Sequence, residues 1–304
     1  MPSALITGGT GFVGRYLAAR LLAMDYEVVG TRYLEADPSV AFDTAPLDVR
    51  DATAVARLVA DARPDEIYHL AGLSRPTLDA ARDYYDVHLH GTLNVLEAVR
   101  AAGLDHTRTL VVGSAYAYGA WDEIITETTP LEPLNHYGAS KAAGDLAARA
   151  VALEGLVVVR ARPFNHTGPG QSPSFVVPAI VEQVRRIAEG AQPPTLHLGR
   201  VDPTRDFLDV RDVVEAYRQL LVHGVSGEAY NIASGNGTTI ADVVDLAREV
   251  SGVGFELVTE PARVRAHDLP YLVGDAGKLR STTGWAPRHT LRDTLRDMFE
   301  SPGS

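Results

Sequence analysis

The chain has 304 residues, of which 45% are hydrophobic and 22% charged, with a net charge of −11, a pI near 5.3 and no cysteine. This length suits one large α/β domain or a core domain with a smaller lobe, and the acidic balance argues against nucleic acid as a partner. The lack of cysteine excludes disulfides and thiolate metal sites, and we expect no metal ion. No apolar run reaches about 18 residues and the N-terminus lacks a signal-peptide pattern, so we expect no membrane contact and a cytoplasmic location.

The first half alternates short apolar runs with helical stretches. Strands are predicted at 3–8, 26–31, 65–72, 108–114 and 156–162, and helices at 11–24, 51–64, 79–102 and 137–154. Continuously apolar strands that alternate with helices are typical of a parallel sheet covered on both faces. We therefore predict an α/β fold with a doubly wound parallel sheet, a Rossmann-type dinucleotide-binding domain, over residues 1–162.

After Arg162 the pattern changes. Residues 162–174 form a predicted loop rich in Pro, Gly, Asn and Ser, and they are followed by predicted helices at 176–190 and 239–252 and predicted strands at 195–199, 230–234 and 255–260. This mixture predicts a smaller α+β lobe for the substrate, mainly over residues 163–304. The boundary is soft, because segments around 205–250 are expected to return to the first domain.

A glycine-rich stretch follows the first predicted strand. In LITGGTGFVG, residues 5–14, Gly8, Gly11 and Gly14 lie directly after that strand and at the start of the first predicted helix. Gly8 suits the tight turn, Gly11 the approach of a pyrophosphate to the backbone, and Gly14 the close packing of helix on strand. The helix N-terminus adds free N–H groups and a partial positive charge. The spacing predicts a dinucleotide-binding loop, the alternative being a chance glycine cluster at an ordinary turn.

The end of the second predicted strand indicates which dinucleotide binds. NAD-binding proteins usually carry an acid there for the ribose hydroxyls, whereas VVGTRYL offers Thr31 and Arg32 and no acid before Glu35. Arg32 could hold a 2′-phosphate through two parallel hydrogen bonds, so we expect NADP(H) in preference to NAD(H); the alternative is a surface arginine. Asp48, which follows the third strand-like segment, is a candidate adenine contact or a simple cap.

Tyr137 and Lys141 form a second motif. Because the chain has only two lysines, Lys141 and Lys278, a Tyr-x-x-x-Lys pair is unexpected by chance. On a helix, residues four apart share one face, and a lysine ammonium near a phenol lowers the pKa of the phenol from about 10. Tyr137 is thus a candidate general acid/base, and the small residues 138–140 leave room for a flat ring against the helix. The alternative is a surface pair on an amphipathic helix.

Ser114 adds a third polar group. It lies at the carboxyl end of a predicted strand, where ligands bind in open α/β sheets, so its hydroxyl could orient a carbonyl oxygen; the alternative is a turn cap. Together with TGGTGFVG at 7–14, HLAG at 69–72 and the Tyr137–Lys141 pair, it resembles the extended short-chain dehydrogenase/reductase family over essentially the whole chain.

That resemblance implies roles for individual residues. Ser114, Tyr137 and Lys141 would be the catalytic triad, and Lys141 would also hold the nicotinamide ribose. The cofactor-binding set that it implies is Gly8, Thr10, Gly11, Phe12, Val13, Gly14, Arg32, Asp48, Val49, Leu70, Ala71, Tyr137 and Lys141.

The second half is similar to the GDP-sugar branch of that family, which holds GDP-6-deoxy-4-keto-mannose reductases and GDP-mannose 4,6-dehydratases. The similarity lies in residues 162–178, 205–217 and 269–287. It implies that Ser114, Asn165, Arg205 and Arg265 contact a nucleotide-diphosphate sugar, because a diphosphate needs cations even on an acidic protein. The alternative for each arginine is a surface ion pair.

The choice between reduction and dehydration depends on a missing acid. The dehydratases carry a Thr followed by acids where this chain has Ser114-Ala115-Tyr116, so the resemblance favours NADPH-dependent reduction of the C4 ketone of a nucleotide-linked 4-keto-6-deoxyhexose, with a GDP-linked substrate. His88 departs from the family pattern N-V-x-G-T, which has Asn there; it either fills a structural role or tunes proton supply.

Other functions stay open at this stage. A nucleotide-sugar 4-epimerase would use the same triad and retain NAD, a 4,6-dehydratase is a close relative, and a non-catalytic dinucleotide sensor would need only the glycine loop. The resemblance further implies a homodimer formed through the helices at 79–102 and 137–154.

Overall fold

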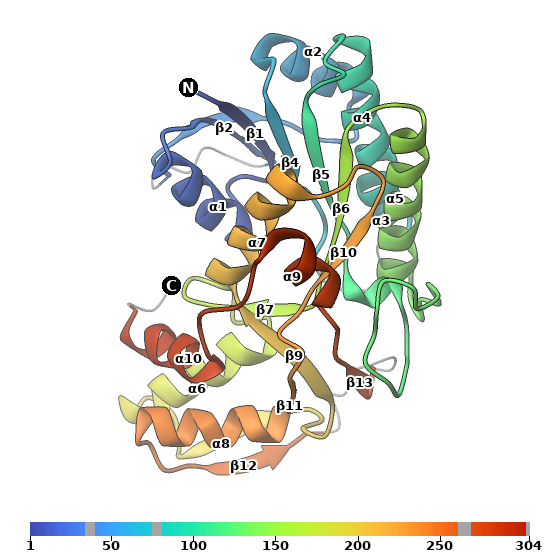
Figure 1. Cartoon of the computed structure of the whole chain (residues 1–304). Coiled ribbons are helices and arrows are strands. Elements are labelled where there is room, and N and C mark those ends of the chain that lie inside the picture. Colours follow the sequence, from blue (N-terminus) through green and yellow to red (C-terminus); the bar gives the residue numbers. More distant parts are fainter. Residues whose placement is uncertain (34–39, 75–80, 261–268, 302–304) are drawn as a thin grey trace.

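A seven-stranded parallel sheet forms the centre of the protein in a computed structural model that describes residues 1–33, 40–74, 81–260 and 269–301 (Figure 1). The strand order is β10-β6-β5-β4-β1-β2-β3, and every pairing is parallel. The strands are β1 (Ser3–Thr7), β2 (Glu27–Arg32), β3 (Asp43–Pro46), β4 (Glu66–His69), β5 (Arg108–Val112), β6 (Val158–Pro163) and β10 (Ala229–Ile232). The direction of strand succession reverses between β1 and β4, which opens a crevice at the carboxyl edge of the sheet.

Helices cover both faces of this sheet, and its central strands therefore bury side chains on both sides. The helices are α1 (Phe12–Leu22) and α7 (Val210–His223) on one face, and α2 (Ala52–Ala62), α4 (Gly91–Ala101) and α5 (His136–Leu153) on the other (Figure 1). Leu17, Leu21 and Val213 pack under the first face. Val95 and Val151 pack on the second. The predicted doubly wound α/β fold is confirmed.

The second lobe has its own core. Its strands are β7 (Asn165–Thr167), β9 (Thr204–Asp209), β11 (Gly237–Thr239) and β13 (Tyr271–Leu272) in one sheet, and β8 (Thr195–Leu198) and β12 (Glu256–Thr259) in another; its helices are α6 (Val176–Ala188), α8 (Ile240–Ser251) and α10 (Leu291–Glu300). Val177, Ile180, Val181 and Val184 recur at helical spacing along α6 and are buried against α8 and α10. A short helix, α9 (Gly277–Thr283), packs on α7.

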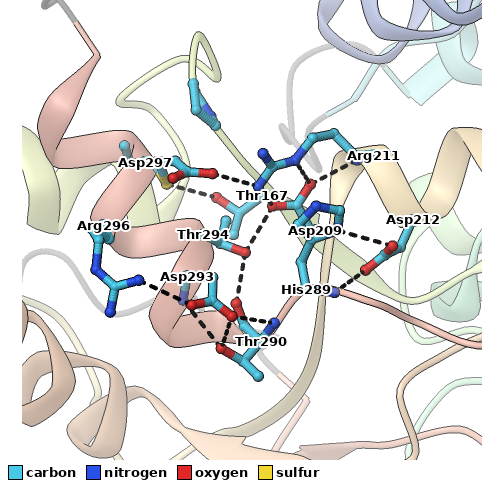
Figure 2. A network of polar contacts seen from close by, with 12 residues as sticks. Thr167, Asp209, Arg211, Asp212, His289, Thr290, Asp293, Thr294, Arg296 and Asp297 are labelled. Carbon is cyan, nitrogen blue, oxygen red and sulfur yellow. Dashed lines mark hydrogen bonds and ion pairs between the residues drawn. The ribbon is translucent and has the colours of Figure 1, made fainter.

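The chain crosses between the two parts more than once. It leaves the sheet after β6, forms β9 in the second lobe, returns through α7, and adds β10 as the edge strand beside β6 (Figure 1). A polar network fastens α10 to this crossing (Figure 2). There the buried carboxylate of Asp209 accepts hydrogen bonds from Arg211 Nη2 at 2.7 Å and Thr294 Oγ1 at 2.8 Å, and Arg211 also pairs with Asp297.

Most predicted elements are present with ends shifted by a few residues. The long helical stretch predicted over 79–102 is confirmed in its described part, but it is not a uniform α-helix. In its described part, α3 (Ala81–Tyr85) leads into a π-helical turn, η2 (Asp86–His90), before α4 begins. The predicted loop at 162–174 also contains β7, whose pairing with β9 comes from far along the chain.

Candidate active site

A cleft of about 1000 Å³ opens at the carboxyl edge of the sheet. It gathers residues from both halves of the chain. The predicted site residues that line it are Gly8, Thr10, Gly11, Phe12, Val13, Gly14, Asp48, Val49, Leu70, Ala71, Ser114, Tyr137, Lys141, Asn165 and Arg205. Arg32 does not line the cleft, although its neighbour Tyr33 does, and Arg265 lies outside the described residues.

The glycine loop has the close backbone contacts that its sequence predicts. Gly8 has a φ of +71°, a conformation that favours glycine, and its N–H donates to Thr31 Oγ1 at 3.0 Å. A Cβ on Gly14 would lie 2.5 Å from the carbonyl oxygens of both Gly8 and Gly9, so α1 can approach the loop only if glycine is there. Helix α1 begins at Phe12, and its first turn lines the cleft. The free N–H groups of this turn can therefore bind a pyrophosphate.

A cluster of polar groups occupies the cleft end beyond β2 and β3. Arg50 Nη2 donates to Asp48 Oδ2 at 2.7 Å and to the Tyr33 hydroxyl at 2.9 Å. The hydrogen bond from Arg50 holds the pKa of Asp48 below its usual value. Asp48 therefore already forms an ion pair with Arg50. Arg50 itself lines this end of the cleft and was not predicted from the sequence.

The three predicted catalytic residues meet where β5 ends. Ser114 follows β5, and its Oγ accepts from the N–H of Tyr116 at 3.2 Å. Tyr137 stands in the first turn of α5, whose N-cap Asn135 accepts from the N–H of Gly138 at 2.8 Å. Ser114 and Tyr137 both line the cleft, and the serine side chain is close enough to the phenol to lower its pKa, so the two elements converge on one point.

The charge state of this group differs from the prediction. Burial raises the pKa of Tyr137 to about 12, although the hydrogen bond with Ser114 acts in the opposite direction. Burial also lowers the pKa of Lys141 to about 8. The expected lowering of the tyrosine pKa by the lysine is therefore wrong for the chain alone: the Lys141 ammonium donates to the carbonyl of Val112 at 3.0 Å, and desolvation of the phenol dominates. Tyr137 is protonated at neutral pH, as a proton donor must be.

The small residues beside Tyr137 allow neighbouring segments of the chain to pack closely against α5. A Cβ on Gly138 would lie 2.5 Å from the carbonyl oxygen of Tyr116, and Ser140 is completely buried. The expectation that this run leaves space for a ligand ring is therefore corrected: Gly138 and Ser140 allow α5 to pack closely on its neighbours.

The second lobe supplies the opposite wall of the cleft. Asn165 begins β7, and its buried Oδ1 has no hydrogen-bond partner among the described residues. Arg205, on β9, is 4% exposed and lines the same space. A buried carbonyl oxygen without a donor costs about 1–3 kcal/mol, so Asn165 is fitted for a ligand that carries a donor.

Besides Tyr33, sequence reasoning missed two tyrosines that line the cleft near Tyr137. The ring of Tyr116 lies edge-on to that of Tyr137, with centroids 5.8 Å apart, and Tyr217 of α7 is buried to 1% exposure. Tyr116 could have been found from its position two residues after Ser114. Nothing local marks Tyr217, because only the return of α7 to the sheet brings it to the cleft.

Comparison with known proteins agrees with this geometry. A family model described as GDP-mannose 4,6 dehydratase matches residues 5–298. The chain is 37% identical to GDP-6-deoxy-D-mannose reductase from Pseudomonas aeruginosa, over 96% of this chain and 94% of that protein. It is 29% identical to GDP-6-deoxy-D-talose 4-dehydrogenase from Aggregatibacter actinomycetemcomitans, over 98% and 97%.

Two solved structures show the same fold around different cofactors. The structure of RMD from Pseudomonas aeruginosa complexed with NADPH has a TM-score of 0.85 and 33% identity, and covers 98% of each chain. The Thermus thermophilus UDP-glucose 4-epimerase in complex with NAD has a TM-score of 0.85 and 29% identity, and also covers 98% of each chain. The chain belongs to the GDP-mannose 4,6-dehydratase family, and it is an NAD(P)-dependent sugar-nucleotide enzyme of the extended short-chain dehydrogenase/reductase type.

Proposed function

We propose that this protein uses NADPH to reduce the C4 ketone of GDP-4-keto-6-deoxy-mannose to a GDP-6-deoxyhexose. The observation that carries the proposal is that Ser114, Tyr137 and Lys141 meet in one cleft of about 1000 Å³, which the glycine loop also lines. The 37% identity to a GDP-6-deoxy-D-mannose reductase supports the choice of substrate.

The cofactor would lie along the carboxyl edge of the sheet. Its pyrophosphate fits the glycine loop and the N-terminus of α1, and its adenosine end fits the groups around Asp48, Val49 and Arg50. The bound nicotinamide supplies hydride to the ketone carbon. NADP(H) is preferred over NAD(H) because β2 ends in Thr31-Arg32 and is followed by Tyr33, without an acid for the ribose.

The chain's own residues manage the oxygen of the ketone. Ser114 and Tyr137 donate hydrogen bonds to it, which orients the carbonyl and stabilises negative charge as it develops. Tyr137 then gives its proton to that oxygen, and a pKa of about 12 keeps the proton in place until the oxygen becomes basic. Lys141 would hold the ribose hydroxyls of the cofactor, and its ammonium would add a positive charge close to the phenol.

The second lobe would hold the sugar nucleotide. The donorless Oδ1 of Asn165 accepts a hydroxyl or N–H of the substrate, and Arg205 pairs with the diphosphate. Arg265 is proposed as a second cation for this group. In this division, residues 1–162 with the return segments around 205–250 bind the dinucleotide, and residues 163–304 mainly bind the substrate.

The cleft favours reduction over dehydration. Among the described residues that line it, the carboxylates are Asp48 and Asp83, and both lie within 4.0 Å of Arg50 at the adenosine end. Among the described residues at the reaction end, around Ser114 and Tyr137, there is none of the acids that would remove a proton from C5 and assist loss of water from C6. Hydride transfer with proton donation therefore suits the site better than elimination.

Two further features belong to this proposal. We place the enzyme in the cytoplasm and expect a homodimer that forms through α4 and α5. No helix in the described part of the chain is long and apolar enough to span a bilayer.

The experiment that tests the function is NADPH oxidation against a panel of nucleotide-linked 4-keto-6-deoxyhexoses, each made in situ by its matching dehydratase. We expect rapid oxidation with the GDP-linked member, and product NMR then gives the configuration at C4. No oxidation with any member, together with NAD retained through purification, would overturn the proposal in favour of a 4-epimerase. Formation of a 4-keto sugar from GDP-mannose would overturn it in favour of a dehydratase.

A further inference from the structure

His88 is a buried, ring-bearing residue that the proposed chemistry does not use. It lies on the π-helical turn η2, is 3% exposed, and its ring stands edge-on to that of Tyr137, with centroids 5.6 Å apart at an interplanar angle of 84°. Single π turns are rare and costly, and they often occur at functional sites. The position of this turn beside the reactive phenol calls for a physical account.

The hydrogen bonds of His88 fix the position of its proton. The N–H of Leu73 donates to Nε2 at 3.0 Å, and because a backbone N–H can only donate, Nε2 must be an acceptor. The imidazole proton is therefore on Nδ1, which lies 2.8 Å from Ser140 Oγ and donates to it. The hydroxyl of Ser140 in turn donates to the carbonyl oxygen of Tyr137 at 2.9 Å. The chain runs in one direction, from Leu73 through His88 and Ser140 to the backbone of Tyr137.

The surroundings of His88 exclude a role as a proton shuttle. Burial and the nearby positive charge of Lys141 lower the pKa of His88 to about 2, so the ring stays neutral. Protonation of Nε2 would also set two donors, the ring N–H and the N–H of Leu73, against each other. The ring can hold its neighbours in place, but it cannot exchange a proton with them near neutral pH.

Close backbone contacts show that this arrangement is built into three elements. A Cβ on Gly144 would lie 2.3 Å from the carbonyl oxygen of His88, so α5 touches the π turn directly. A Cβ on Gly72 would lie 3.2 Å from both His88 Nε2 and Lys141 Nζ. The hydroxyl of Thr92 donates to the His88 carbonyl at 2.7 Å, which satisfies this acceptor within the irregular turn.

We propose that His88 is a positioning residue, whose neutral Nδ1–H imidazole ties the cleft-lining loop at Gly72–Leu73 to the first turn of α5 and so sets where Tyr137 delivers its proton. The inference rests on the proposed role of Tyr137. It also explains how His can stand where the family pattern has Asn. Either side chain offers one hydrogen-bond donor and one acceptor, and these are the two groups that the site requires at this position.

Two substitutions separate the hydrogen bonds from the ring. His88→Phe keeps an aromatic edge against Tyr137 but removes both the donor and the acceptor. His88→Asn removes the ring but keeps an amide donor and a carbonyl acceptor. Ser140→Ala breaks the same chain at its other link. For His88→Phe and Ser140→Ala we expect kcat to fall about 100-fold, because a small misplacement of a catalytic group has an effect of this size. KM for NADPH and for the sugar should stay within about threefold of the parent values. His88→Asn should restore kcat to within about tenfold of the parent.

A spectroscopic measurement tests the tautomer without any substrate. Long-range ¹⁵N–¹H spectra of the full chain should show His88 protonated at Nδ1 and unchanged between about pH 5 and pH 9. An Nε2–H tautomer, or titration in that range, would overturn the inference. So would a parent-like kcat in His88→Phe, or a kcat in His88→Asn that is no higher than that of His88→Phe. If the substrate panel fails while the tautomer is as described, the proposed function falls and the hydrogen-bond chain stands.

Discussion

Lys141 is anchored to Val112, the last residue of β5, through a 3.0 Å hydrogen bond from its ammonium group to the backbone carbonyl. Ser114 follows Val112 by two residues along the chain. The lysine of α5 and the serine beyond β5 are therefore fixed to the same strand end. Any shift of α5 against the sheet would move the phenol, the ammonium and the hydroxyl relative to one another.

The pH dependence should report Lys141 rather than Tyr137. With a pKa of about 8, Lys141 loses its charge as pH rises through that value, whereas Tyr137, at about 12, keeps its proton. We expect kcat/KM for reduction to fall on the alkaline side with a midpoint near 8. Lys141→Arg, whose guanidinium does not titrate in this range, should move that limb to higher pH. A limb that stays near 8 in the Arg variant would assign it to another group.

Tyr137→Phe should remove turnover and spare cofactor binding. The loss of a positioned proton donor typically costs about 10²–10⁴ in rate, while the dissociation constant for NADPH, measured by fluorescence, should change by less than about threefold. Tyr85→Phe is the matched control, because its phenol lies 3.2 Å from His136 Nδ1 and does not line the cleft. Comparable losses in the two variants would show that the effect is structural.

The glycines of the loop should separate folding from binding. Gly14→Ala places a Cβ 2.5 Å from two carbonyl oxygens, so α1 must move and the melting temperature should fall by several degrees. Gly11→Ala meets a single carbonyl at 3.1 Å in the cleft, so its main cost should be NADPH affinity. Gly254→Ala, in open space, is the control and should alter neither. Equal melting temperatures for the Gly11 and Gly14 variants would contradict this assignment.

Asp145 should be among the costliest positions for stability. Its carboxylate, 2% exposed, pairs with Arg160 and with Arg162 Nη2 at 2.7 Å, and it fastens α5 to β6. Asp145→Asn leaves two buried guanidinium groups short of a charge, which costs about 3–5 kcal/mol in chemical denaturation. Asp245→Asn, which breaks a mostly exposed pair with Arg248, should cost under about 0.5 kcal/mol. A small effect at Asp145 would mean that water reaches this cluster.

The network in Figure 2 should contribute stability that depends on pH. Burial alone would raise the pKa of Asp209, but hydrogen bonds from Arg211 and Thr294 outweigh it and the pKa is lowered. That contribution is present above the unfolded pKa, about 4, and disappears as pH falls through the folded value.

Thr294→Val should therefore cost about 1.5–3 kcal/mol at neutral pH, with the difference shrinking in acid as Asp209 takes up a proton. Arg296→Ala, on the same helix but in an exposed pair, is the control. Urea titrations at pH 7 and in acid provide the measurement, and a cost that does not depend on pH would point to packing of Thr294 instead.

Local patterns in the sequence predict the first domain well. Gly8, Gly11 and Gly14, Ser114 and the Tyr137–Lys141 pair act through contacts close to the strand ends or within one helix, so their spacing alone places them in the cleft. The π turn at Asp86–His90 could not be predicted in this way, because it packs against α5, which is distant in sequence. The two are so close that a Cβ on Gly144 of α5 would clash with the carbonyl oxygen of His88.

The second lobe shows the opposite case. β7 is only three residues long and exists because β9 lies beside it. The raised pKa of Tyr137 likewise depends on burial by segments distant in sequence. Such properties are set by tertiary packing, which no local pattern encodes.

The place of β10 at the edge of the sheet has a consequence for synthesis. A ribosome releases β6 well before residues 229–232, so a strand that is completely buried in the folded protein keeps one open side until α7 has formed and β10 can add to it. Unpaired strand edges of this kind recruit other chains. Fragments that stop short of residue 229 should therefore aggregate. In the complete chain, β10, which follows the return through α7, covers the open edge of β6 and so protects the molecule against aggregation.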